Sequence, residues 1–168
     1  MYPIISIVNS VFETAEKLNI KIEYLIQLHT VLLGIQYNHL KLRDQNAFEE
    51  NFVKGECYAY IPVVTDLLKM QKLICPDYLT TDYARKVLVN AKINMLKKDR
   101  ITLAVENHNG SFDTIQYRVN PNTKNNEFIF HLITEVLEKV IKYNNLELQE
   151  ISFEHMDLIN DIINCKKE

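Results

Sequence analysis

The sequence predicts a mainly α-helical fold: a single-domain helical bundle built around a buried central helix, with one small antiparallel β-hairpin at about residues 101–119. Three glycines and four prolines in 168 residues favour long regular elements with few tight turns. Apolar residues recur at intervals of three and four along several stretches, which is typical of helices. A chain of this length fits one domain, residues 1–168, that buries about 70% of its unfolded surface.

The central helix is expected over Ile22–Leu42. Its apolar side chains cover most of the helix circumference, which is typical of a helix buried in the middle of a domain. They are Ile22, Leu25, Ile26, Leu28, Val31, Leu32, Leu33 and Ile35. Gly34 costs roughly 1 kcal/mol relative to alanine, so it marks either a close backbone approach or a simply tolerated glycine. An amphipathic helix over Ile4–Leu18 precedes it and ends near Asn19, a residue that tolerates the left-handed cap position.

A polar bend over Arg43–Lys54 follows the central helix, with Phe48 and Phe52 as expected anchors. Pro62 suits the first position of the next helix, because its fixed φ is helical and its missing N–H has no intrahelical partner there. The Tyr58-Ala59-Tyr60 segment before it is expected to be extended. The helix that begins at Pro62 is expected to stop before Pro76.

A further helix is expected to begin at caps within Thr80-Thr81-Asp82 and to end near Lys98. Its core face consists of Ala84, Leu88, Ala91 and Met95. The alternating stretch Ile101–Val119 then predicts the β-hairpin around His108-Asn109-Gly110. A three-residue loop with Gly110 in the left-handed region pairs Leu103 with Ile115 and Ile101 with Tyr117. We prefer it to a two-residue Asn-Gly turn because it gathers the apolar residues on one face.

Two helices complete the predicted fold. Asn125 or Asn126 is expected to cap the first, which ends at Asn144-Asn145, and Ser152 to cap the second. The inward side chains of the first are Phe128, Ile129, Leu132, Ile133, Val136, Leu137, Val140 and Ile141. Those of the second are Met156, Ile159 and Ile163.

Charge and cysteine content restrict the class of protein. A net charge of −3 gives no electrostatic footprint for nucleic acid, although the basic run Lys97, Lys98 and Arg100 leaves a nucleic-acid contact as the minor alternative to a solvated helix end. Three widely spaced cysteines fit reduced thiols better than a zinc site. No apolar run approaches the ~18 residues of a membrane span, and no basic leader precedes the first apolar residues. A cytoplasmic protein is expected.

The sequence predicts no catalytic residues and no cofactor, because the familiar phosphate-binding, serine-hydrolase and metalloprotease motifs are absent. Glu127, His131 and Glu135 stand four apart on one helix face, a spacing that suits a metal but also the polar side of an amphipathic helix. His29 is interpreted as a hydrogen-bonded core or interface histidine rather than a catalyst. His155 beside Asp157 is no stronger a candidate.

Two stretches resemble the Panacea family (the SocA-like, phage-associated GepA type). They are Leu28-His29-Thr30-Val31-Leu32-Leu33 and Cys57-Tyr58-Ala59-Tyr60-Ile61-Pro62-Val63. The second matches the family's aromatic-proline motif in type at Tyr58, Tyr60, Pro62 and Val63, whereas the motif glycine is Ile61 here. The resemblance covers about two thirds of the chain, and the 101–119 hairpin has no clear counterpart in the family.

The resemblance implies a non-enzymatic protein-binding domain: an antitoxin that neutralises a toxin by direct contact or by delivering it to a protease. The expected partner surface is an exposed aromatic strip that joins part of the 43–54 bend; it comprises Tyr58, Tyr60, Phe52 and Tyr37. One alternative is a phage- or mobile-element-encoded inhibitor of a host defence or replication protein. Another is a metal-dependent hydrolase that uses His131 with Glu127 and Glu135.

Overall fold

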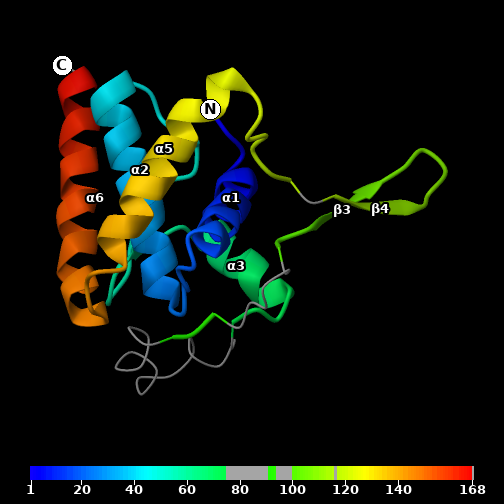
Figure 1. Cartoon of the computed structure of the whole chain (residues 1–168), viewed down its shortest axis with the longest axis horizontal. Coiled ribbons are helices and arrows are strands. Elements are labelled where there is room, and N and C mark those ends of the chain that lie inside the picture. Colours follow the sequence, from blue (N-terminus) through cyan, green and yellow to red (C-terminus); the bar gives the residue numbers. More distant parts are fainter. Residues whose placement is uncertain (75–90, 94–99, 116, 168) are drawn as a thin grey trace.

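The computed structural model is mainly α-helical, as predicted, and describes residues 1–74, 91–93, 100–115 and 117–167. Its helices are α1 (Ile4–Lys17), α2 (Leu25–Arg43), α3 (Pro62–Met70), α5 (Glu127–Val140) and α6 (Asn145–Lys167), with a short 3₁₀ helix, η3 (Lys124–Asn126), before α5. Two antiparallel sheets of two strands each pair β1 (Val53–Lys54) with β2 (Ala59–Tyr60) and β3 (Leu103–Glu106) with β4 (Phe112–Ile115). The helices gather into one body, from which β3 and β4 project (Figure 1).

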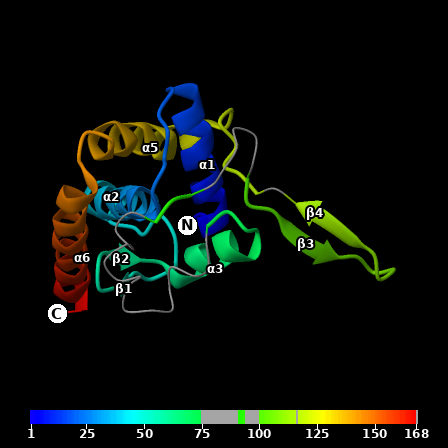
Figure 2. The ribbon, with the colours of Figure 1, turned by 90° about the horizontal axis from the view of Figure 1, so that it is seen from below.

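The predicted central helix is confirmed, because every residue of α2 from Leu25 to Gln36 is buried. Seen from below, α5 lies on one side of α2 and the β1–β2 hairpin on the other, and α6 runs alongside (Figure 2). Gly34 marks a close approach: a Cβ at this position would lie 2.6 Å from Cγ1 of Val136 on α5. The glycine is therefore needed for the contact between α2 and α5.

The segment before α2 is extended, so this helix begins at Leu25 and not at Ile22. The backbone N–H of Leu25 donates to the carbonyl of Ala91 at 2.9 Å, and that of Ile93 donates to the carbonyl of Glu23 at 2.8 Å. Residues 91–93 are thus extended too, which makes the predicted helix through Ala91 wrong at this point. The rest of that helix, with its caps at 80–82 and Ala84, Leu88 and Met95, falls outside the described residues.

The helix-ending signals on either side of α2 are confirmed. α1 ends at Lys17, and Asn19 adopts the left-handed conformation with φ 56°. α3 begins at Pro62, as expected, and ends at Met70, because Lys72 turns the chain with φ 57°.

The β3–β4 hairpin has the predicted register, with Leu103 opposite Ile115. Its loop is His108-Asn109-Gly110, where Gly110 has φ 83°. At the base, Asn9 of α1 replaces the expected pairing of Ile101 with Tyr117: its Nδ2 donates to the carbonyls of both residues, at 3.0 and 2.7 Å. The hairpin is therefore anchored to α1 at its base while its strands extend away from the body.

The cap of α6 differs from the prediction, whereas that of α5 lies at a predicted residue. Asn144 caps α6, because its Oδ1 accepts from the N–H of Glu147 at 2.9 Å while Glu147 Oε1 accepts from the N–H of Asn144 at 3.3 Å. Ser152 lies inside α6, and its Oγ accepts a 2.7 Å hydrogen bond from the N–H of Ala59 in β2. Asn126, one of the two predicted cap residues, is the N-cap of α5, but its side chain makes no capping bond.

Candidate functional site

Two rings of the predicted aromatic strip, Tyr58 and Tyr60, pack against His29. The His29 ring stacks on Tyr58 with centroids 5.7 Å apart and meets Tyr60 edge-on at 6.2 Å. Only 6% of Tyr58 is exposed, and burial raises the pKa of its hydroxyl. The prediction of an exposed strip is therefore wrong for Tyr58, because its ring fills the space between α2 and β2.

His29 is a hydrogen-bonded core histidine, as interpreted from the sequence. Its Nδ1 accepts from the backbone N–H of Ile61 at 3.3 Å, so its Nε2 carries the proton and donates to Thr65 Oγ1 at 3.2 Å. Complete burial lowers its pKa to about 3 and keeps the ring neutral. His29 thus fixes β2 and the start of α3 against α2.

The other three residues of the predicted surface are half-buried. Tyr60 stands opposite Val53 across the β1–β2 pair, and Phe52 lies 6.0 Å from the buried ring of Phe48. Tyr37 stacks on His155 of α6 at 5.5 Å. These rings therefore lie at the rim of the core, Phe52 and Tyr60 at the 52–60 hairpin and Tyr37 between α2 and α6.

The predicted metal ligands do not converge. His131 pairs with Glu135 at 3.2 Å on the exposed side of α5, and within the described ranges no three His, Cys, Asp or Glu side chains are placed to share a metal ion. Of the basic run, Arg100 pairs with Glu16 of α1 at 2.8 Å, whereas Lys97 and Lys98 lie outside the described residues. The polar-face interpretation of α5 accounts for the pair of His131 and Glu135.

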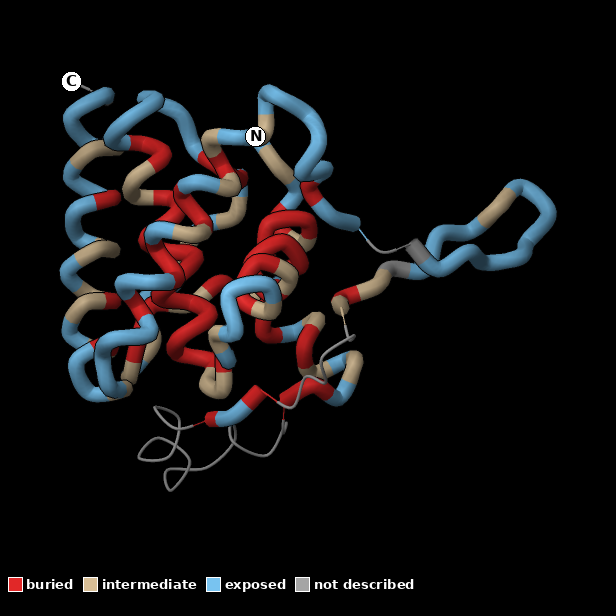
Figure 3. The backbone as a smooth tube through the Cα atoms, in the orientation of Figure 1, coloured by how far each residue is buried: buried red, intermediate tan, exposed pale blue. Residues whose placement is uncertain are grey.

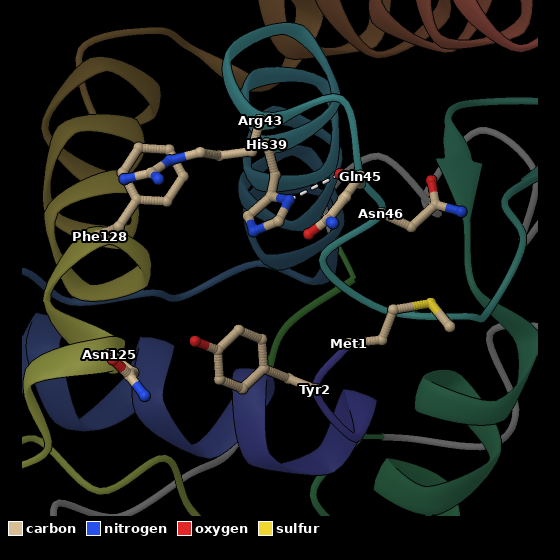
Figure 4. Close-up of a pocket in the computed structure, with 8 residues that line it drawn as sticks. All are labelled: Met1, Tyr2, His39, Arg43, Gln45, Asn46, Asn125 and Phe128. Atoms are coloured by element: carbon tan, nitrogen blue, oxygen red, sulfur yellow. Dashed lines mark hydrogen bonds between the residues drawn. The ribbon is translucent and has the colours of Figure 1, made fainter. Parts of the chain in front are cut away.

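The structure adds a hollow that the sequence did not predict, between the end of α2 and the start of α5 (Figure 4). It has a volume of about 500 Å³, and its lining comes from the chain start, α2, the following bend and the η3–α5 junction. The lining residues are Met1, Tyr2, His39, Arg43, Gln45, Asn46, Asn125 and Phe128. Segments far apart in the sequence thus enclose one polar cavity.

Aromatic rings and nitrogen donors define the chemistry of this cavity. Arg43 lies across the ring of Phe128, with its guanidinium carbon 4.1 Å from the ring centroid. His39 Nδ1 binds the carbonyl of Gln45 at 2.6 Å, and Tyr2 donates its hydroxyl to Asn126 Oδ1 at 2.9 Å. The four-residue spacing of His39 and Arg43 on α2 places both at one end of the helix, but the sequence does not indicate that the chain start and α5 close over them.

No family model, curated protein or solved structure matches this chain. The resemblance to the Panacea family therefore stays a prediction. Among the described helices, none combines the length and the apolar character that a membrane span requires.

Proposed function

We propose that this chain is a protein-binding domain whose contact element is the β3–β4 hairpin. The observation that carries the proposal is the exposure of apolar side chains on an element that projects from the body. Phe112 is 67% exposed and Val105 is 37% exposed, although both belong to a regular strand pair (Figure 3). Apolar side chains held out in solvent on a protruding element are typical of a surface that a partner covers.

The number of strands supports the same proposal. A two-stranded hairpin is marginally stable in water, and a third strand or a packed face normally supports it. Within the described part of the chain, β3 and β4 pair only with each other, so each offers an outer edge to solvent. A partner that adds a strand supplies backbone hydrogen bonds to that edge and side chains to cover Phe112 or Val105.

The resemblance to the Panacea family supports a toxin as the partner and an antitoxin as the function. Tyr60, Phe52 and Tyr37, which the sequence predicts as partner contacts, are half-buried, and we propose them as secondary contacts beside the hairpin. Tyr58 is not proposed as a contact, because its ring belongs to the core. Inhibition of a host defence or replication protein is the alternative function for the same hairpin.

The test is capture of partners by the tagged full-length chain from its own host, repeated with Phe112→Ser and with Leu146→Ser. Leu146 is 70% exposed at the start of α6 and serves as a matched apolar control. We expect Phe112→Ser to reduce capture of a stoichiometric partner by about tenfold, the effect of removing a central interface aromatic. Leu146→Ser should leave capture unchanged.

The identity of the captured protein separates the two functions. A small protein encoded beside this chain, whose toxicity the wild-type chain suppresses on co-expression, supports the antitoxin; a large host enzyme supports the inhibitor. Equal capture by Phe112→Ser and the wild type contradicts the hairpin as contact element. Failure of every variant to capture a partner contradicts the protein-binding proposal itself.

A further inference from the structure

We infer that the cavity between α2 and α5 is a binding site for a small phosphate monoester, with the phosphate at Arg43 and the organic part against Tyr2 and His39. This inference is independent of the hairpin and of the proposed partner. It rests on an unpaired nitrogen of His39 that opens into the cavity, an accessible guanidinium and the size of the cavity (Figure 4).

His39 supplies the unpaired nitrogen. The residue is only 8% exposed, and its Nδ1 donates to the carbonyl of Gln45, which can only accept. In the neutral ring Nε2 is therefore an acceptor, and within the described residues it has no hydrogen-bond partner. In Figure 4 this side of the ring faces the space between Tyr2 and Phe128. A buried ring with one nitrogen satisfied and the other directed into a cavity suits a ligand that brings a hydroxyl or amine donor.

Arg43 supplies the anion-binding group. Its stacking on Phe128 orders the guanidinium and leaves the N–H fork free to bind an oxyanion. A second hollow of about 600 Å³ shares Arg43, Asn125 and Phe128 with the first and adds Lys124, Glu127 and His131. Arg43 and Lys124 therefore outnumber the single lining carboxylate, which favours a doubly charged phosphate over a neutral ligand.

The dimensions favour a small molecule over a macromolecule. Ligand pockets in proteins typically measure roughly 300–1,000 Å³, a range that includes this cavity. The ring of Tyr2 offers a flat apolar surface for a base or a sugar. A nucleoside monophosphate or a sugar phosphate satisfies both the charge and the shape.

The first test titrates the full-length protein with adenosine 5′-monophosphate, ribose 5-phosphate, adenosine and inorganic phosphate, followed by nuclear magnetic resonance shifts of His39 and Arg43. We expect the two phosphate esters to bind at millimolar concentration or below and adenosine to bind at least tenfold more weakly. Comparison of the two esters shows whether the aromatic surface holds a base. Absence of shifts with both esters at about 1 mM would overturn the inference.

Three variants test the assignment of the groups. Arg43→Gln should weaken ester binding at least tenfold, and Glu127→Gln should strengthen it about twofold, since it removes the opposing charge. Lys142→Gln, the same charge change as Arg43→Gln but placed beyond the far end of α5, should have no effect. Equal losses from Arg43→Gln and Lys142→Gln, with both variants folded by circular dichroism, contradict a built site. Arg43 is exposed, so its replacement leaves the core intact.

Discussion

Helix α2 and the β3–β4 hairpin are both rich in apolar residues, yet their environments are opposite. Neighbouring elements cover α2 on every side from Leu25 to Gln36, whereas among the hairpin residues whose burial the structure describes, Ile101 and Val119 at the base are the buried ones (Figure 3). An element rich in apolar side chains is therefore expected to pack against another surface. For α2 this surface belongs to the same chain, and for the hairpin we propose that it belongs to another protein.

Polar side chains show the same contrast. On α2, Gln36 binds the bend after the helix twice: Nε2 donates to the carbonyl of Phe48 at 3.0 Å, and Oε1 accepts from Ala47 at 2.7 Å. His29 likewise binds β2 and α3. In the hairpin, the side chains of Asn107, Asn109 and Ser111 form hydrogen bonds within this group of three residues. Disturbance of α2 should therefore spread through the fold, whereas disturbance of the hairpin should stay local.

The largest difference in stability is expected between variants of two phenylalanines. Phe48 is fully buried under α2, and Phe112 is exposed on β4. We expect Phe48→Ala to lower the free energy of unfolding by about 3–5 kcal/mol, because it leaves a cavity in the core. Phe112→Ala should change it by less than about 0.5 kcal/mol. Urea denaturation of both variants measures the difference, and comparable losses would show that the hairpin is part of the core.

The pH dependence of stability provides the second comparison, between a buried and an exposed histidine. The pKa of His29 is lowered to about 3 in the folded state, while in the unfolded chain it stays near 6.5. Below pH 6.5 the unfolded state therefore binds more protons than the folded state. The stability that the neutral, buried His29 permits is fully present above pH 6.5 and is lost as the pH falls. Between pH 7.5 and pH 5 the free energy of unfolding should decrease by about 2 kcal/mol.

His29→Gln should remove most of this decrease, because the amide can accept from Ile61 and donate to Thr65 without titrating. Burial also lowers the pKa of His155, which leaves a smaller dependence of the same sign. His131→Gln is the control, since this ring lies on the exposed side of α5. If the free energy of unfolding of His29→Gln falls with pH as steeply as that of the wild type, groups other than His29 cause the acid sensitivity.

The sequence predicted those elements whose signals are local. Pro62 predicted the start of α3, and Asn19 predicted the end of α1. Gly110 predicted the loop and register of the β3–β4 hairpin. Each of these depends on φ preferences or on alternation within a few residues, which tertiary contacts reinforce here. The burial of α2 was predictable for a similar reason, because its apolar residues surround the helix.

The errors arise where a distant segment competes with a local preference. Ser152 reads as a helix cap, but its hydroxyl binds β2 from inside α6, and Asn144 provides the cap earlier in the chain. Ala91 fits a helical pattern but pairs with the segment before α2. Tyr58 was predicted to be exposed because no residue near it in the sequence indicates that His29 stacks on its ring. The cavity at His39 was unpredictable in the same way, since three segments far apart in the sequence line it.

The smallest changes are expected for variants of two glycines. Gly34→Ala gains about 1 kcal/mol of helix propensity, but its Cβ meets the stiff Val136 at 2.6 Å, so overpacking of about 1–3 kcal/mol leaves a net loss near 1 kcal/mol. The double variant with Val136→Ala should relieve the overpacking, and a loss equal to the sum of the single variants would contradict the contact.

Gly110→Ala places a Cβ in open space but strains a residue with φ 83° by about 1 kcal/mol. Because the described bonds between the hairpin and α1 lie at its base, this strain should open the strands locally without unfolding the helices. Amide hydrogen exchange in β3 and β4 should accelerate by about fivefold, while exchange in α2 stays unchanged. Faster exchange in α2 would mean that the hairpin and the helices unfold as one unit, which would weaken the case that its exposed side chains await a partner.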